Sequence, residues 1–319
     1  MPLNVVFFGT PSIAVPSLRA LTLSPLLRVS AVFTQPAARR SRRGQAQPSE
    51  VALCARELGL ELHEVESVNE GLALERLTAL SPEAIAVVSF GQILKRCVLE
   101  LPLHGCLNFH PSMLPALRGA APVQRAVMAG VRTSGLTIMR LVRKLDAGPI
   151  LEQRVWELGD TLNAEQLMRQ AGELGAGMMR AVLERMARGE AIAAQSQDDA
   201  RATFAPPLAK EDGVLDFRRD AAALSDLVRG VQPWPRAQCT LASETPRRII
   251  VHEARLGEGS GNAGEILATD KQGVLVGCGR GALWLTKVQL EGKSVVTGFE
   301  LANGLRLKPG ARFVLREVA

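Results

Sequence analysis

The first third of the chain alternates short apolar runs with segments of helical periodicity, and this alternation restricts the fold more than any other feature. Each apolar run is shorter than a buried helix but long enough for a strand that is buried on both faces. Strands separated by helices build a parallel sheet that helices cover on both sides. The sequence therefore predicts an α/β fold with a doubly wound, mostly parallel, Rossmann-like sheet, with strands at residues 5–8, 29–33, 60–65, 84–88 and 106–109.

Helix signals lie between these runs. Helices are expected at residues 15–23, after the N-cap Ser49, and at residues 70–80. Two further apolar segments, residues 135–141 and 151–158, are expected to pair as strands.

The longest helical pattern covers residues 164–188. Asn163 and Gln166 stand three residues apart at its start, as in a capping box. Apolar residues at helical spacing predict a stripe that faces the core rather than a cofactor. The stripe consists of Leu167, Ala171, Leu174, Met178, Val182 and Met186.

The length of 319 residues is typical of two domains. The polar residues 190–207 are expected to link a first domain, residues 1–189, to a second, residues 208–319. After the linker, one helix is followed by short β-like segments separated by glycine turns, which predicts a small β-barrel. The helix is expected at residues 221–229, and the strands at residues 248–254, 264–268, 274–277, 282–288 and 312–315.

Cysteine usage and hydropathy indicate the compartment. The five cysteines are scattered and show no CxxC spacing, so neither a zinc site nor a disulfide framework is expected, and a reducing cytoplasm fits best. No run reaches the roughly 18 apolar residues that a membrane span needs. The N-terminus lacks the charged region of a signal peptide and is expected to form the first strand.

Basic residues favour an anionic partner. The formal net charge is +6, and four arginines, Arg39, Arg40, Arg42 and Arg43, occupy five positions of one polar loop. Such a loop repels itself until an anion orders it, although a solvated surface loop is the alternative.

Three polar residues at predicted strand ends suggest an acyl-transfer site. Asn108 and His110 end one strand, and Asp146 follows another apolar run in an acidic turn. An amide can donate to an oxyanion, an imidazole can move a proton, and a carboxylate can orient it. Each residue type is also common in turns and caps. A dinucleotide site is not expected, because the first turn, FFGTPS, lacks the glycines of G-x-G-x-x-G.

Four segments carry a family resemblance that extends over essentially the whole chain. They are NFHPSMLP at residues 108–115, RGAAPVQ at 118–124, GLTIM at 135–139 and LDAG at 145–148. Together they resemble the folate-dependent formyltransferases. Within that family, RGAAPVQ is similar to the members that formylate methionyl-tRNA.

The resemblance implies a reaction and a set of partners. The formyl donor would be 10-formyltetrahydrofolate, with no metal, and the acceptor would be the amino group of charged initiator methionyl-tRNA, at the start of translation. Asn108, His110 and Asp146 would be catalytic, and neither Ser112 nor Cys106 would form a covalent intermediate. The second domain would be the family's OB-like tRNA-binding domain, and the protein is expected to be a monomer.

The resemblance also implies binding residues. Phe90 stands where relatives usually have Tyr, and residues 140–144 lack an acidic residue that relatives often have. Arg118, with the four loop arginines, would contact tRNA. Folate would lie against Phe90, Gln92, Ile93, Leu94, Ser112, Met113, Leu114, Pro115 and Val142.

Other functions remain open from the sequence. The acceptor could be a nucleotide-sugar amine or glycinamide ribonucleotide, and the reaction could be hydrolysis of the folate donor. A non-catalytic RNA-binding protein on the same fold is a further alternative, although a pure binder would not need all three polar residues of the site.

The arginine loop generates a first testable prediction. Replacing Arg39, Arg40, Arg42 and Arg43 with Ala is expected to raise KM for tRNA and flatten its salt dependence, because fewer counterions are released on binding. The Kd for folate should stay unchanged. Initial rates at several salt concentrations test this, and an unaltered salt slope would contradict a phosphate-binding role.

Overall fold

The computed structural model describes residues 1–39 and 46–314, which form two compact units. Unit 1 consists of Met1–Ala120, Ser134–Glu157 and Met168–Ala205. The other stretches, 121–133, 158–167 and everything after Ala205, form unit 2. None of the helices described is long and apolar enough to cross a membrane.

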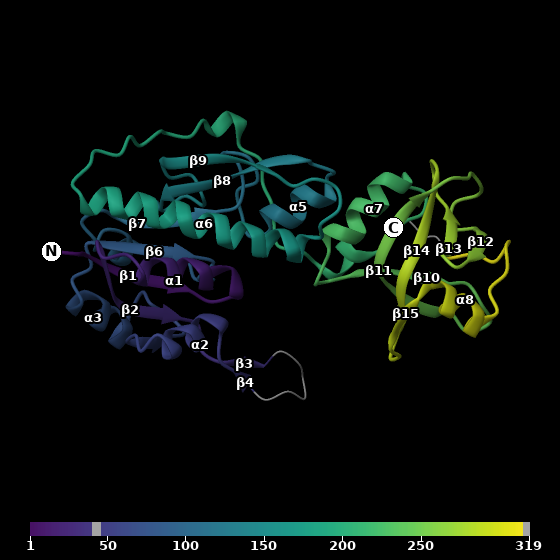
Figure 1. Cartoon of the computed structure of the whole chain (residues 1–319), viewed down its shortest axis with the longest axis horizontal. Helices are drawn as coiled ribbons and strands as arrows, with labels where there is room; N and C mark the ends of the chain where they lie inside the picture. Colours follow the sequence, from purple (N-terminus) through teal and green to yellow (C-terminus); the bar gives the residue numbers. More distant parts are fainter. Residues whose placement is uncertain (40–45, 315–319) are drawn as a thin grey trace. The chain divides into compact units, whose positions relative to one another are not determined.

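Unit 1 is built on a seven-stranded sheet in the order β5-β2-β1-β6-β7-β8-β9. The first five of these strands are parallel to their neighbours, whereas β8 runs antiparallel to β7. The mostly parallel α/β fold predicted from the sequence is therefore confirmed (Figure 1). The strands are β1 (Leu3–Gly9), β2 (Leu27–Thr34), β5 (Leu62–Glu64), β6 (Ala84–Val88), β7 (Cys106–His110), β8 (Thr133–Arg140) and β9 (Ile150–Glu157).

The predicted helix starts are confirmed by their caps. The Ser49 hydroxyl accepts a hydrogen bond from the Ala52 N–H, and Asn163 and Gln166 exchange hydrogen bonds between side chain and backbone. The remaining elements of this unit are α1 (Val15–Thr22), α2 (Glu50–Glu57), α3 (Gly71–Ala79), α4 (Arg96–Leu99), α6 (Ala164–Ala187, whose residues before Met168 group with unit 2), the 3₁₀ turns η1 (Ser12–Ala14) and η2 (Asp199–Arg201), and a hairpin of β3 (Ala38–Arg39) and β4 (Ala46–Gln47).

The core of unit 1 lies on both faces of the sheet. Phe8 packs against Phe33 and Phe90, with ring centroids 5.3 and 4.8 Å apart. The apolar stripe of α6 is buried as predicted except at Leu174, which is 45% exposed. The prediction is wrong there because the next residue, Gly175, faces β7, where the Phe109 ring fills the space that a side chain would need.

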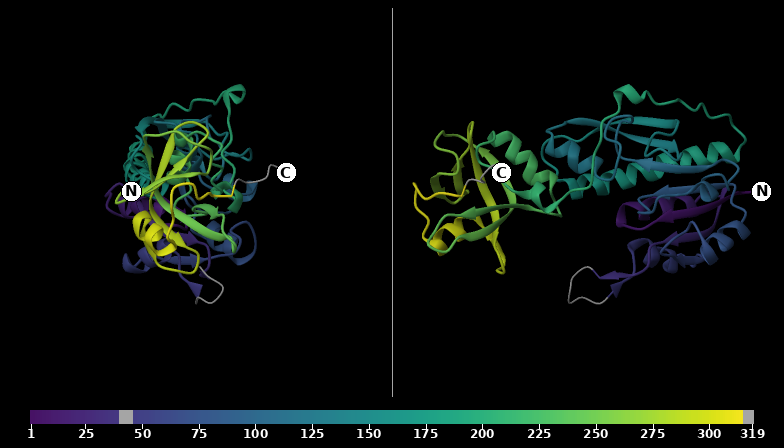
Figure 2. Two further views of the ribbon diagram at one scale, coloured as in Figure 1. Left: turned by 90° about the vertical axis from the view of Figure 1, so that its right-hand side faces the viewer. Right: turned by 180° about the vertical axis from the view of Figure 1, so that it is seen from behind.

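Unit 2 contains an antiparallel sheet in the order β10-β11-β14-β13-β12, with β15 paired to β14. Figure 2 shows these strands in green and yellow. The sheet agrees with the small β-barrel expected, but β10, β15 and α8 were not predicted. The strands are β10 (Ala237–Leu241), β11 (Arg247–Gly257), β12 (Ile266–Asp270), β13 (Gly273–Gly277), β14 (Ala282–Leu290) and β15 (Val295–Thr297), with helices α5 (Pro122–Met128), α7 (Ala221–Gly230), α8 (Gly298–Leu305) and the turn η3 (Lys210–Gly213).

The last predicted strand does not form within the residues described. Arg312 and Phe313 make single bridges to Glu265 and Leu241 instead. The Phe313 ring is buried against Phe217, with centroids 5.3 Å apart, so this segment closes the core of unit 2 as an irregular stretch.

The segment expected as a linker belongs largely to unit 1. Gln195 exchanges two backbone hydrogen bonds with Ile150 in β9, and Ala205 donates to the carbonyl of Arg118. Figure 1 shows the chain after α6 running past β9 and β8 in green. The first domain is not continuous either, because residues 121–133 and 158–167 group with unit 2. The domain boundaries from the sequence stay a prediction.

Two glycines of α6 provide a matched test of this packing. A Cβ at Gly175 would lie 2.5 Å from the Phe109 ring, whereas a Cβ at Gly177 would meet nothing within 4 Å. Gly175→Ala is expected to destabilise the protein by about 1–3 kcal/mol through overpacking. Gly177→Ala should stabilise it by about 0.5–1 kcal/mol, because glycine is a poor helix former.

Urea unfolding of both variants measures these changes. Equal effects of the two substitutions would contradict the close contact between α6 and β7.

Candidate functional site

Strand β7 carries two of the three expected catalytic residues. Asn108 and His110 are two positions apart, so their side chains leave the same face of the strand. The residue between them, Phe109, packs on the opposite face toward α6. Opposite them in β8 are Met139 and Thr137. The site therefore lies at the carboxyl end of β7, where α/β sheets bind ligands.

The His110 ring is buried and held at one nitrogen. Its Nε2 lies 3.0 Å from the carbonyl oxygen of Leu117, which can only accept, so Nε2 carries the hydrogen. In the neutral ring this leaves a lone pair on Nδ1, which lies 3.9 Å from Oδ2 of Asp146. That separation exceeds a hydrogen bond. A proton taken up at Nδ1 would thus face a carboxylate.

Burial sets the charge of this histidine. Loss of hydration lowers the pKa of His110 below its ordinary value, and the Asp146 charge and the Leu117 carbonyl oppose the shift only in part. The imidazole is therefore neutral at neutral pH. A neutral ring next to a carboxylate can act as a base whose conjugate acid is stabilised by the negative charge.

The Asp146 carboxylate is fixed by a backbone donor from the RGAAPVQ segment. Its Oδ2 accepts the N–H of Gly119 at 2.8 Å. Gly119 has a φ of 121°, and a Cβ there would lie 2.7 Å from the Ala205 carbonyl oxygen, so only glycine fits. Asp146 itself has a φ of 46°, a conformation that costs a non-glycine residue about 1–3 kcal/mol. Strain of this kind is common at functional sites.

The Asn108 amide is available to a ligand. Its side chain is half-buried, and we find no hydrogen bond from it to any residue in the described part of the chain. An amide group with two N–H donors and no protein acceptor can donate to a substrate oxygen. The structure thus brings together the three side chains that the sequence singled out.

The loop after His110 is held from β8 and β9. Thr137 donates through Oγ1 to the Ser112 carbonyl at 2.7 Å, and Gln153 donates to the Leu114 carbonyl at 2.9 Å. Ser112 and Leu114 are buried, whereas Met113 and Pro115 are half-buried. Contacts of this loop with a ligand would therefore come mainly from backbone groups and the half-buried residues.

The residues after β6 also divide into buried and accessible ones. Phe90 is only 2% exposed, and its ring packs in the core against Phe8. Its carbonyl already accepts hydrogen bonds from the side chains of Thr10 and Gln35, so this residue presents little to a ligand. The Gln92 side chain is tied to backbone groups of Val65 and Val68, and Leu94 is buried. Ile93 is 85% exposed.

Val142 is also exposed. Of the nine side chains that the sequence assigns to folate, Ile93 and Val142 are therefore the most accessible.

The arginines expected to bind tRNA differ in their surroundings. Arg118 is 1% exposed, and its guanidinium is already bonded to Gln197 and Asp199, so a direct phosphate contact is not what its geometry favours. Arg40, Arg42, Arg43 and the side chain of Arg39 lie outside the described residues.

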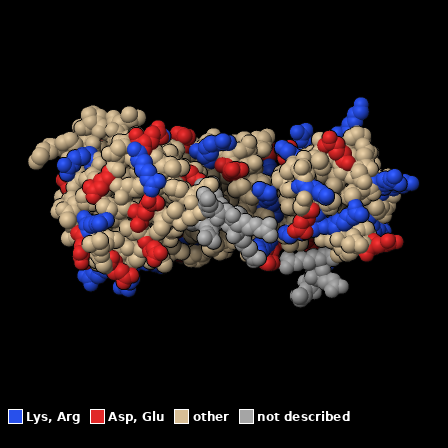
Figure 3. All heavy atoms as spheres, turned by 90° about the horizontal axis from the view of Figure 1, so that it is seen from below, with Lys and Arg blue, Asp and Glu red and all other residues tan. Residues whose placement is uncertain are grey.

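Unit 2 exposes many basic side chains. On the face in Figure 3, blue basic groups are interspersed with red acidic ones. Eight examples lie between residues 247 and 308. They are Arg247, Arg248, Lys271, Arg280, Lys287, Lys293, Arg306 and Lys308.

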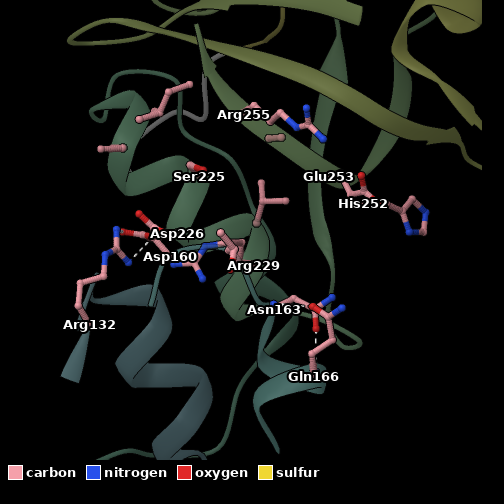
Figure 4. Close-up of a pocket in the computed structure, with 15 residues that line it drawn as sticks. Arg132, Asp160, Asn163, Gln166, Ser225, Asp226, Arg229, His252, Glu253 and Arg255 are labelled. Atoms are coloured by element: carbon pink, nitrogen blue, oxygen red, sulfur yellow. Dashed lines mark hydrogen bonds and ion pairs between the residues drawn. The ribbon is translucent and has the colours of Figure 1, made fainter. Parts of the chain in front are cut away.

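Unit 2 also contains a cavity of about 630 Å³ between the start of α6, α7 and β11 (Figure 4). Asp226 in its wall is buried and accepts hydrogen bonds from Arg132 at 2.9 Å and from Arg229 at 2.6 Å. Two arginines thus share this one carboxylate. The cavity could not be predicted from the sequence, because its lining residues are spread from 132 to 256. The described residues include no group of three potential metal ligands.

Sequence reasoning missed one residue of the site. Gln197 donates to the backbone of the Asp146 turn, at the Asp146 and Gly148 carbonyls. It stands in the polar stretch that was expected to be a linker, and nothing in its local sequence distinguishes it from its neighbours.

Comparisons with known proteins agree with this geometry. The formyl transferase family matches residues 3–183, and the formyl transferase C-terminal domain matches residues 207–306. A methionyl-tRNA formyltransferase of Citrifermentans bemidjiense is 37% identical over 97% of this chain and 95% of its own. One from Ectopseudomonas mendocina is 40% identical over 95% of each chain.

A solved structure shares the fold at low identity. The structure of HypX from Aquifex aeolicus in complex with tetrahydrofolic acid has a TM-score of 0.63 and 16% identity. The match covers 99% of this chain but 51% of that protein. On the family matches and the identity to the two relatives, the chain belongs to the formyl transferase family.

Proposed function

We propose that the protein transfers the formyl group of 10-formyltetrahydrofolate to the amino group of methionyl-tRNA, the step that prepares initiator tRNA for translation. The observation that carries the proposal is the grouping of Asn108, His110 and Asp146 at the end of β7. The full-length relatives named methionyl-tRNA formyltransferase favour this acceptor over other amines.

The protein must assist three events at the formyl carbon: attack by the amine, build-up of negative charge on the oxygen, and departure of the folate nitrogen. The amine nitrogen attacks the formyl carbon, and a tetrahedral intermediate with a negatively charged oxygen forms. The Asn108 amide donates to that oxygen, and one such preorganised donor is worth about 3–4 kcal/mol in related sites. The bond between the carbon and the folate nitrogen then breaks, and that nitrogen takes up a proton.

His110 moves the proton between the two nitrogens. Its Nδ1 lone pair accepts the proton that the attacking amine loses, and the imidazolium formed is stabilised by Asp146, 3.9 Å away. The same proton can then pass to the departing folate nitrogen. A covalent route through Cys106 is not part of the proposal, because burial raises the pKa of its thiol to about 12.

The folate donor is proposed to lie along the loops of residues 90–94, 112–115 and 142–146. Exposed apolar side chains here are Ile93, Val142 and Leu145, while Phe90, Ser112 and Leu114 are buried. Backbone groups can read the amide edge of a pterin, so few specific side chains are needed. Binding of folate is expected without a metal.

The deciding experiment compares acceptors with one donor. Formyl transfer from 10-formyltetrahydrofolate is measured with charged initiator tRNA, free methionine, glycinamide ribonucleotide and a nucleotide-sugar amine. Turnover with the tRNA alone supports the proposal. Turnover with only a small amine would overturn the acceptor, and formate release without any acceptor would indicate a hydrolase.

The role of Asp146 yields a mutational prediction. Asp146→Asn keeps an oxygen for the Gly119 N–H but removes the charge that stabilises protonated His110. We expect kcat to fall by about 100-fold or more, with Kd for tRNA unchanged. Asp270→Asn, at an exposed carboxylate of unit 2, is the control. An equal loss of tRNA binding in Asp146→Asn would contradict the assigned role.

The burial of His110 yields a titration prediction. The sequence contains four histidines, so their ring resonances can be followed by NMR and His110 assigned from His110→Gln. Because burial lowers its pKa, its midpoint is expected below the ordinary value of about 6.5.

The same shift affects stability. The unfolded state takes up this proton more readily than the folded state, so the free energy of unfolding should fall as the pH drops below about 6.5. His110→Gln should weaken this dependence. A midpoint at or above 6.5 would overturn the neutral-base assignment.

A further inference from the structure

We propose that Gln197 is a positioning residue for the turn that contains Asp146. It acts with Arg118 as a clamp that joins this turn to the loop that contains Arg118. The clamp is defined as Arg118, Gln197 and Asp199. This inference rests on the proposed function, because it assigns Gln197 to the placement of Asp146.

The Gln197 amide bonds directly to both the turn that contains Asp146 and the side chain of Arg118. Its Nε2 donates to the Asp146 carbonyl at 2.9 Å and to the Gly148 carbonyl at 2.7 Å. Its Oε1 accepts from Nε and Nη2 of Arg118 at 3.1 and 2.8 Å. Both N–H donors and both acceptor positions of the amide are thus used. The reversed amide would set oxygen against two carbonyls, so the network fixes its orientation.

Arg118 forms the rigid side of the clamp. Its side chain is 1% exposed and also donates to Asp199 at 2.8 Å. Its backbone donates to the Thr203 carbonyl at 2.8 Å and accepts from Ala205 at 2.7 Å. A buried guanidinium that lost these acceptors would carry a large desolvation cost, so Arg118 cannot easily move away.

The other side of the clamp is the turn that contains Asp146. This turn needs outside support, because Asp146 has a φ of 46° and its carboxylate must stay 3.9 Å from His110. Gln197 holds two carbonyls of the turn, and Asp199 pairs with Lys144 just before it. The turn is therefore held on both sides of the carboxylate.

Glycine at position 148 fits the same arrangement. A Cβ there would lie 1.7 Å from the Arg140 carbonyl, so the turn passes directly against β8. The carbonyls of Asp146 and Gly148 then both point to Gln197. Loss of the amide would leave two carbonyls without their donor, and the strained turn could relax away from His110.

The test is Gln197→Met in the full chain, with Gln195→Met as a matched control. Methionine has nearly the same length as glutamine but cannot bond the carbonyls or Arg118. Gln195 stands two positions earlier in the same segment and its side chain is exposed. Displacement of a catalytic group by about 1 Å costs about 100-fold in rate, so kcat should fall about 10- to 100-fold while KM for tRNA and folate is retained.

A second variant separates positioning from stability. Gln197→Glu keeps an acceptor for Arg118 but removes both donors to the turn, and it is expected to lose kcat as Gln197→Met does. If Gln197→Met unfolds, Gln197→Glu decides the question. A wild-type kcat in a folded Gln197→Glu variant would overturn the proposal. A loss of activity that is fully explained by a smaller fraction of folded protein would also overturn it.

Amide hydrogen exchange provides a readout that does not need the reaction. Residues 144–149 should exchange faster in Gln197→Met than in Gln195→Met, and unchanged exchange would overturn the clamp. If the wild-type protein formylates no tRNA but the exchange increases, the proposed function has failed while the clamp on this turn stands.

Discussion

The hydrogen bond from the Gly119 N–H to the Asp146 carboxylate is the constraint on which the site depends. It joins segments 27 positions apart and fixes an oxygen beside His110. A hydrogen bond to a charged group contributes about 1.5–3 kcal/mol. Two close approaches and one unusual backbone angle make it possible, because Gly119 passes against Ala205, Gly148 passes against Arg140, and Asp146 adopts a φ that side chains rarely allow.

The sequence predicted the parallel sheet and the three polar residues of the site better than the side chains that hold the site in place. Runs such as residues 84–88 are buried on both faces of a parallel sheet, and Ser49 is a local cap, so neither depends on distant contacts. Asn108, His110 and Asp146 could be singled out because their residue types suit acyl transfer and they stand in family motifs, and their catalytic roles are part of the proposal. Gln197 could not, because its function comes from partners 49 and 51 positions away. Local composition describes the stretch around it only as polar.

Leu174 and Phe90 also show that packing, rather than local sequence, decides which side chains are accessible. Leu174 fits the helical period of α6, but Gly175 is the residue that meets the Phe109 ring. Phe90 precedes a loop of the site, yet the aromatic cluster with Phe8 holds its ring in the core. Periodicity gives the face of an element only to within about one residue, whereas packing decides which atom is accessible.

Charge and chemistry are carried by different groups in this molecule. Near the site, Arg118 is buried and Lys144 is paired with Asp199, so these two cations serve the protein's own loops. Affinity for a polyanion would then depend on exposed basic groups, such as Arg143 and the residues of unit 2. Salt screens such exposed charges far more than buried ones. If His110 and Asp146 carry the chemical step as proposed, ionic strength should therefore act on acceptor binding and leave that step largely unaffected.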